Sequence, residues 1–218
     1  MVEVVAAQAP EELVELSPGA LLTAVRETRR AEERAAADLL VLAHQWAVLH
    51  PATDPADAAT FCARGADGAT YAPITGVGCP QVAEYSVPEL GAVLGVSTDA
   101  AKKLLGHALE LRHRLPRSWA LVHDGRVPAW RARRGAEATI HATPALSVEA
   151  ADWVDRQVAA VAGRVGTAQL DRLVTEAIAR FQLACEDASD DGEDAPDPRH
   201  VTIDRSPEHF SPTVRVEA

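Results

Sequence analysis

The sequence predicts a mainly α-helical protein, a multi-helix bundle that contains a helix-turn-helix-like unit and ends in a short β-like segment. Aromatic residues make up only 4% of the 218 residues, whereas hydrophobic residues make up 47%. The core therefore has to consist mostly of Ala, Leu and Val. Ala and Leu favour helices, and the β-branched and aromatic runs typical of strands are scarce. Apolar residues also recur at helical spacing through much of the second half of the chain.

The first half of the chain is expected to be organised around one long helix. Ser17-Pro18 is a typical helix start, because a hydroxyl can cap free amide groups and proline suits the first turn. The helix is expected to end before His50-Pro51, since the residue before a proline avoids the helical conformation. The predicted elements of this half are an N-terminal tail over 1–18, a long helix over 19–49, a short helix that can form over 54–64, and a Gly- and Pro-rich loop over 65–80.

The second half has more regular patterns. Ser147 and Thr167 stand at helix-capping positions, and Ala151, Val154 and Val158 have the spacing of one helix face. The predicted helices cover 86–94, 98–114, 116–123, 128–142, 147–162 and 167–184, and with the long helix they make a helical domain over 19–184. An acidic linker over 185–198 and the start of an incomplete C-terminal unit over 199–218 follow, the latter with two short strands at 201–203 and 214–216.

The segment 86–111 has the pattern of a helix-turn-helix. Gly95 can adopt the positive φ of a tight turn, and Ser97 is placed to cap the second helix. An apolar stripe follows at helical spacing, which makes 98–108 the predicted recognition helix. The side chains expected to be exposed on this helix are Thr98, Asp99, Lys102, Lys103 and His107.

Charge is distributed unevenly along the chain. The net charge of −11 argues against a nucleic-acid-binding protein. The window 102–134, however, has nine Lys or Arg against two acids, whereas 186–197 has seven acids and no base. The basic window predicts an anion-binding face, although a solvated helix surface is the simpler interpretation of a charge run. The residues expected to contact DNA are Ser97, Thr98, Lys102, Lys103, His107, Arg126, Arg131 and Arg134.

Eight short segments in a fixed order carry a resemblance to a known family. They are 82–85, 89–97, 125–133, 138–139, 146–147, 168–170, 173–174 and 199–203. Together they resemble the 13E12-repeat, HNH-endonuclease-associated family, whose N-terminal helical domain is a domain of unknown function (DUF222-like). The match extends over residues 20–218. In that family the helical domain commonly precedes a C-terminal HNH nuclease domain, so the resemblance implies a nuclease context.

The sequence departs from this family pattern in lacking the nuclease motif. An HNH site needs histidines as metal ligand and general base, with asparagine or a similar residue orienting the base. The sequence contains no asparagine and no Cys-x-x-Cys pair, and its eight histidines are scattered without acidic partners at ligand spacing. No catalytic residue, metal site or cofactor is therefore predicted.

Three hypotheses for the function follow. The first is a non-catalytic DNA-binding accessory domain of an HNH-endonuclease-type or mobile-element protein. The second is a protein-interaction module without DNA contact, which forms a homodimer through the helix at 19–49. The third is an enzyme in its own right, and a further alternative is a nuclease only when the chain is joined to a missing C-terminal HNH domain. We expect a cytoplasmic protein that does not contact membranes, because there is no signal peptide, no apolar run of about 20 residues, and three distant cysteines at 62, 79 and 185.

Overall fold

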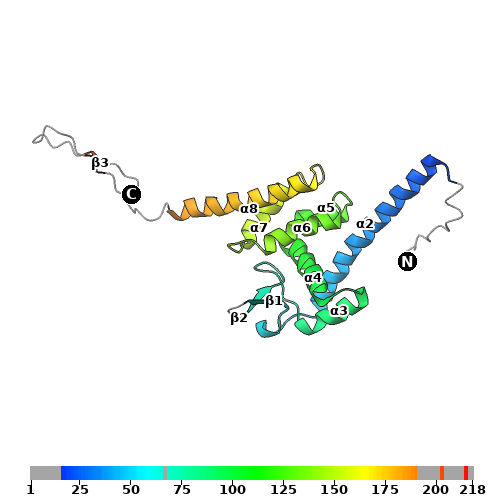
Figure 1. Cartoon of the computed structure of the whole chain (residues 1–218), viewed down its shortest axis with the longest axis horizontal. Helices are drawn as coiled ribbons and strands as arrows, with labels where there is room; N and C mark the ends of the chain where they lie inside the picture. Colours follow the sequence, from blue (N-terminus) through cyan, green and yellow to red (C-terminus); the bar gives the residue numbers. More distant parts are fainter. Residues whose placement is uncertain (1–15, 66–67, 191–201, 204–213, 216–218) are drawn as a thin grey trace, which may run out of the picture. The chain divides into compact units, whose positions relative to one another are not determined.

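The computed structural model describes residues 16–65, 68–190, 202–203 and 214–215. These residues form seven α-helices and two antiparallel pairs of strands, which confirms the mainly helical fold (Figure 1). By their contacts the residues divide into two units, Met1–Phe181 and Gln182–Ala218. Most of the predicted N-terminal tail lies outside the described residues.

Helix α2 (Pro18–Leu49) begins and ends where the sequence predicts. The hydroxyl of Ser17 accepts a hydrogen bond from the amide of Ala20 at 3.3 Å, and Pro18 occupies the first helical position. After the last turn, the amide of His50 donates to the carbonyl groups of the preceding turn, just before Pro51. Local signals alone therefore determine both ends of this helix.

The two halves of α2 have different surroundings. In the C-terminal half, Leu40, Ala43 and Ala47 are buried in a core shared with α4. From 18 to 36 no residue is buried, and this part of α2 extends away from the other helices (Figure 1). The N-terminal half of α2 is thus an exposed helix more than four turns long.

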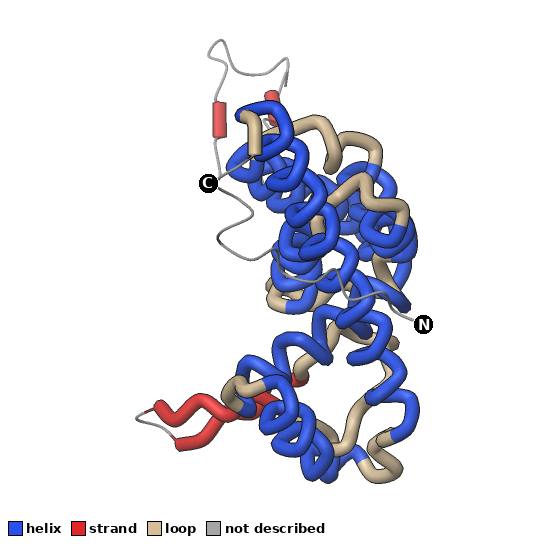
Figure 2. Tube along the Cα trace, turned by 90° about the vertical axis from the view of Figure 1, so that its right-hand side faces the viewer, coloured by secondary structure: helices blue, strands red, loops and turns tan. Residues whose placement is uncertain are grey.

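The structure corrects both predictions for the segment that follows α2. Neither the short helix over 54–64 nor the continuous loop over 65–80 is present. A single 3₁₀ turn (Pro55–Asp57) precedes β1 (Thr60–Gly65), which pairs with β2 (Gly68–Pro73) in an antiparallel hairpin that extends from the helices in Figure 2.

The residues of this hairpin explain the error. Phe61 in β1 and Tyr71 in β2 belong to the aromatic residues that favour strands, and threonines accompany them. Gly65 is paired with Gly68 at the turn, a two-residue connection typical of hairpins. Gly65 and Gly68 therefore stand at the ends of two paired strands, and only the segment after β2 remains of the predicted loop.

Helices α3 (Val87–Leu94) and α4 (Thr98–His113) form the predicted helix-turn-helix-like unit. Between them Gly95 adopts a φ of 67°, the left-handed conformation that favours glycine. The hydroxyl of Ser97 accepts a hydrogen bond from the amide of Ala100 at 3.2 Å and so caps α4.

Helix α4 is the central element of the first unit, where it contacts α2, α3, α5, α6 and β1. Ten of its 16 residues are buried. Among them are Lys102 and His107, which were predicted to lie on an exposed face. A helix that reads DNA must present one free face to the groove, and α4 is enclosed over most of its length.

Four further helices complete the fold. Their apolar stripes face one another, with Val154, Leu170 and Val174 buried. The cavity among them measures about 20 Å³, room for one water molecule and not for a larger ligand. The helices are α5 (Pro116–His123), α6 (Ala129–Ile140), α7 (Val148–Ala159) and α8 (Thr167–Asp190).

Helix α8 continues into the segment predicted to be an acidic linker over 185–198. The end at 184 was predicted from the apolar stripe of this helix. Each residue added to an existing helix gains a backbone hydrogen bond, so the helix can extend beyond that stripe. In the second unit, β3 (Thr202–Ile203) pairs antiparallel with β4 (Val214–Arg215), in agreement with the two short strands predicted there.

Within the described part of the chain, no helix combines the length and the apolar character needed to cross a lipid bilayer.

Candidate functional site

The side chains predicted to contact DNA do not form one free basic surface. Lys102 illustrates the reason, because it is only 7% exposed. Its Nζ lies 2.6 Å from Oε1 of Glu84 and donates to the carbonyl oxygen of Thr60 at 2.7 Å. The helical spacing of the apolar residues in α4 identified one buried side of this helix. The hairpin, which was not predicted, covers a second side that was expected to be exposed. Lys102 therefore joins α4 to β1 and is not available to phosphate.

Lys103 and Arg134 are exposed but ion-paired to acids on other helices. Nζ of Lys103 lies 3.2 Å from Oε1 of Glu137 on α6. The guanidinium of Arg134 donates twice to Asp171 on α8, at 3.1 and 2.6 Å. Exposed pairs of this kind stabilise a fold by about 1 kcal/mol or less. They nevertheless neutralise two charges that the sequence analysis assigned to DNA.

His107 is buried between α4 and α6, and its Nδ1 accepts a hydrogen bond from Nε of Arg133 at 3.1 Å. Burial, and then the neighbouring Arg133 charge, lower the pKa of His107 to about 4. The imidazole is therefore neutral near pH 7 and carries no positive charge for a phosphate.

The remaining predicted residues have separate roles. Nη1 of Arg131 donates to the carbonyl oxygens of Ala162 and Val165, at 3.0 and 3.1 Å, and ties α6 to the segment between α7 and α8. Ser97 caps α4, and Thr98 at the start of that helix is half-buried. Arg126 is exposed, and its guanidinium has no hydrogen-bond or ion-pair partner among the described residues.

Cationic side chains without a partner in the described part of the chain gather instead on α2. Arg26, Arg30 and Arg34 are spaced four residues apart, so they share one face of the exposed half of this helix. Arg29 differs from them, because it is ion-paired within the helix. We call Arg26, Arg30 and Arg34 the arginine row.

A groove of about 400 Å³ lies between the arginine row and the turn that joins α5 to α6. Arg30 and Arg34 line it from α2, and Asp124 lines it from the turn. Arg126 follows in the same turn. Glu33 and Asp38 also line the groove, so its charge is mixed. Mixed charge makes the groove a poor pocket for a single small anion, whereas the arginine row itself extends beyond it.

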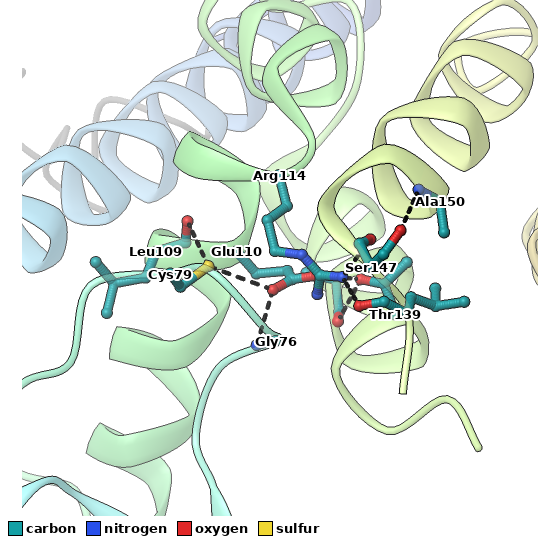
Figure 3. A network of polar contacts seen from close by, with 10 residues as sticks. Gly76, Cys79, Leu109, Glu110, Arg114, Thr139, Ser147 and Ala150 are labelled. Atoms are coloured by element: carbon teal, nitrogen blue, oxygen red, sulfur yellow. Dashed lines mark hydrogen bonds and ion pairs between the residues drawn. The ribbon is translucent and has the colours of Figure 1, made fainter. Parts of the chain in front are cut away.

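The largest polar feature of the interior is a network centred on Glu110 and Arg114 of α4 (Figure 3). Both residues are almost completely buried. Nη1 of Arg114 donates to Oε1 of Glu110 at 2.7 Å, while Nη2 donates to the carbonyl oxygens of Leu146 and Ser147 at 2.6 and 3.0 Å. The ion pair thereby joins α4 to the segment that leads into α7.

Two other segments reach the same carboxylate (Figure 3). The hydroxyl of Thr139 donates to Oε1 of Glu110 at 2.7 Å, and the amide of Gly76 donates to Oε2 at 3.0 Å. The thiol of Cys79 lies 3.7 Å from Oε2. Burial, and then the charge of Glu110, raise the pKa of this thiol to about 12, so Cys79 remains protonated and is not a nucleophile.

Sequence reasoning missed this network. A signal was present, since Glu110 stands between Leu109 and Leu111 on the buried side of α4 and Arg114 follows it four residues later. Both oxygens of the carboxylate accept hydrogen bonds from the protein itself. The network therefore holds several segments of the fold together.

Among the described residues, no three His, Cys, Asp or Glu side chains are close enough to share a metal ion. Comparisons with models of protein families, with curated proteins and with solved structures each find no match. The function therefore has to be argued from the geometry of the chain itself.

Proposed function

We propose that this chain is a non-catalytic DNA-binding module that contacts DNA through the N-terminal half of α2 rather than through α4. The context would be an HNH-endonuclease-type or mobile-element protein, as the resemblance to the 13E12-repeat family implies. One observation supports the choice of helix. Residues 18–36 of α2 contain no buried side chain and carry the arginine row.

The two helices differ in how freely they can reach DNA. The major groove of DNA is about 12 Å wide and admits a helix only if that helix is free of its own protein. Residues 18–36 of α2 include no buried residue, whereas ten of the 16 residues of α4 are buried. Residues four apart rise about 6 Å along a helix axis, so the three arginines of the row can reach successive phosphates.

The net charge of −11 makes binding depend on this local surface. Phosphate neutralisation by three arginines releases about three counterions, so the logarithm of the affinity should fall with the logarithm of salt concentration at a slope of about −3. Arg126, beside the groove, can add one further contact.

Replacing Arg26, Arg30 and Arg34 together with alanine is expected to weaken DNA binding at least tenfold and to flatten the salt dependence. Exposed alanines maintain a helix, so the fold should be unchanged. Fluorescence anisotropy of a labelled duplex across a salt series measures both effects. A matched control replaces three other exposed arginines, Arg164, Arg172 and Arg180, with alanine. These substitutions remove the same total charge. Equal losses for the two triple variants would contradict the proposal.

A second candidate function is self-association through another face of the same half of α2. Leu21, Leu22 and Val25 are 45%, 65% and 59% exposed, although large apolar side chains usually pack. The segment 29–33 begins with two basic residues and ends with two acidic residues. If a second copy packs antiparallel so that residue 31 of each copy lies opposite residue 31 of the other, Arg29 and Arg30 lie opposite the acidic residues of that copy. Such charge complementarity favours a second copy of this chain as the partner.

Replacing Leu22 and Val25 with glutamate is expected to prevent this dimer, because the interface would then bury four carboxylates without partners. Light scattering over a concentration series measures the mass. The wild-type chain should exceed its monomer mass of 23.1 kDa as concentration rises, and the variant should not. Val93→Glu on α3, where the side chain is 81% exposed, is the control. A wild-type chain that stays monomeric throughout would exclude self-association.

A further inference from the structure

Two histidines from distant parts of the sequence face each other between α2 and α4. His44 on α2 and His113 on α4 are 69 residues apart in sequence, yet their Nε2 atoms are 3.3 Å apart. Their ring centroids are 5.3 Å apart, with an angle of 35° between the ring planes. His44 is half-buried and His113 is exposed, so solvent reaches the pair.

The two distances match the geometry of two imidazoles on one metal ion. At 3.3 Å the two Nε2 atoms are within reach of a long hydrogen bond when one of them is protonated, and the same separation suits two ligands of one metal ion. Two nitrogens bound to a tetrahedral Zn²⁺ at about 2.05 Å are separated by about 3.3 Å, and their ring centres by about 5.2 Å. The observed pair has both spacings without any rearrangement.

We propose that His44 and His113 form a two-histidine site for a divalent transition-metal ion of the Zn²⁺, Ni²⁺ or Cu²⁺ class, with water completing the coordination. Imidazole nitrogen is a ligand that suits all three ions. The bound ion would connect α2 to α4 at the principal contact of these helices. The proposal does not depend on DNA binding, since the arginine row lies on the other half of α2.

The surroundings set the protonation of the pair. The charged group beside it is Arg112, whose guanidinium also lies over the ring of Trp119, 5.9 Å from its centroid. Burial is the largest cause that lowers the pKa of both histidines; for His44 the charge of His113 comes next, and the Arg112 charge adds to both. Arg112 also repels a cation, which lowers the affinity of the site.

Titration of the full chain with ZnCl₂ and NiCl₂ tests the site by calorimetry, with thermal unfolding as a second readout. We expect one ion per chain and a rise in Tm, because the ion binds the folded state. His44→Ala and His113→Ala should each lower the affinity at least tenfold and remove the rise in Tm. His141→Ala, an exposed histidine on another surface, should behave as wild type. A double variant, His200→Ala with His209→Ala, accounts for the two histidines outside the described residues.

A spectroscopic signature separates coordination from a merely structural role. Cu²⁺ bound to the wild-type chain should show nitrogen hyperfine splitting from two imidazoles in its electron paramagnetic resonance spectrum. His44→Gln and His113→Gln, which retain a polar side chain and helix-forming character, should each remove that splitting. The site is excluded if these variants bind the three ions as tightly as wild type, or if only the His200 and His209 variant loses binding.

Discussion

Replacing Glu110 with alanine is expected to lower the free energy of unfolding by about 3–5 kcal/mol, because Arg114 would remain buried without its counter-charge. Glu110 is 0% exposed and Arg114 is 2% exposed, so water cannot replace the lost partner. The amide of Gly76 would also lose its side-chain acceptor, while the hydroxyl of Thr139 would keep only the carbonyl oxygen of Ala136. Urea unfolding followed by circular dichroism measures the change.

Two controls show whether the buried charge is the cause. Glu137→Ala removes the exposed partner of Lys103 and should cost less than about 1 kcal/mol. Replacing Glu110 and Arg114 together with leucine should recover much of the loss, because no charge then remains unpaired. If Glu110→Ala is no more destabilising than Glu137→Ala, the network does not contribute to stability as argued.

Replacing Gly106 with alanine is expected to destabilise the protein by about 2–3 kcal/mol, although alanine is normally the better helix former by about 1 kcal/mol. A Cβ atom at position 106 would lie 2.0 Å from the carbonyl oxygen of Ile74. Because that atom belongs to the backbone, the whole segment would have to move away from α4. Thermal unfolding of the purified variant measures the loss.

The matched control for this prediction is Gly135→Ala on α6. A Cβ atom there meets nothing within 4 Å, so the substitution should stabilise the protein by about 0.5–1 kcal/mol. Opposite signs for the two glycine variants are the expected result. A neutral or stabilising Gly106→Ala would show that α4 and the segment at Ile74 are not in the close contact described.

Features that depend on neighbouring residues were predictable from the sequence. Ser17, Ser97 and Ser147 each cap a helix by accepting an amide hydrogen bond from three residues further on. These interactions are local, so composition and spacing were enough to find the helices and the turn at Gly95. The hairpin was the exception. Its strands are stabilised by pairing with each other, and their few apolar residues form too short a pattern to be distinguished from a loop.

The candidate sites depended on contacts between distant residues. Helical spacing shows that one side of α4 is buried, but it does not show how many elements pack around that helix. The hairpin and α6 cover Lys102 and His107, and so remove them from the predicted DNA face. Partners far away in sequence likewise use the charges of Lys103 and Arg134.

The sequence by itself determined the helical class and the ends of most helices, because each follows from interactions within a few residues. Only the tertiary structure decided which cations remain unpaired, which part of α2 stays exposed, and that His44 faces His113. Those features arise when segments separated by tens of residues come into contact. The pairing of a charge and the burial of a side chain are properties of that contact, not of the local sequence.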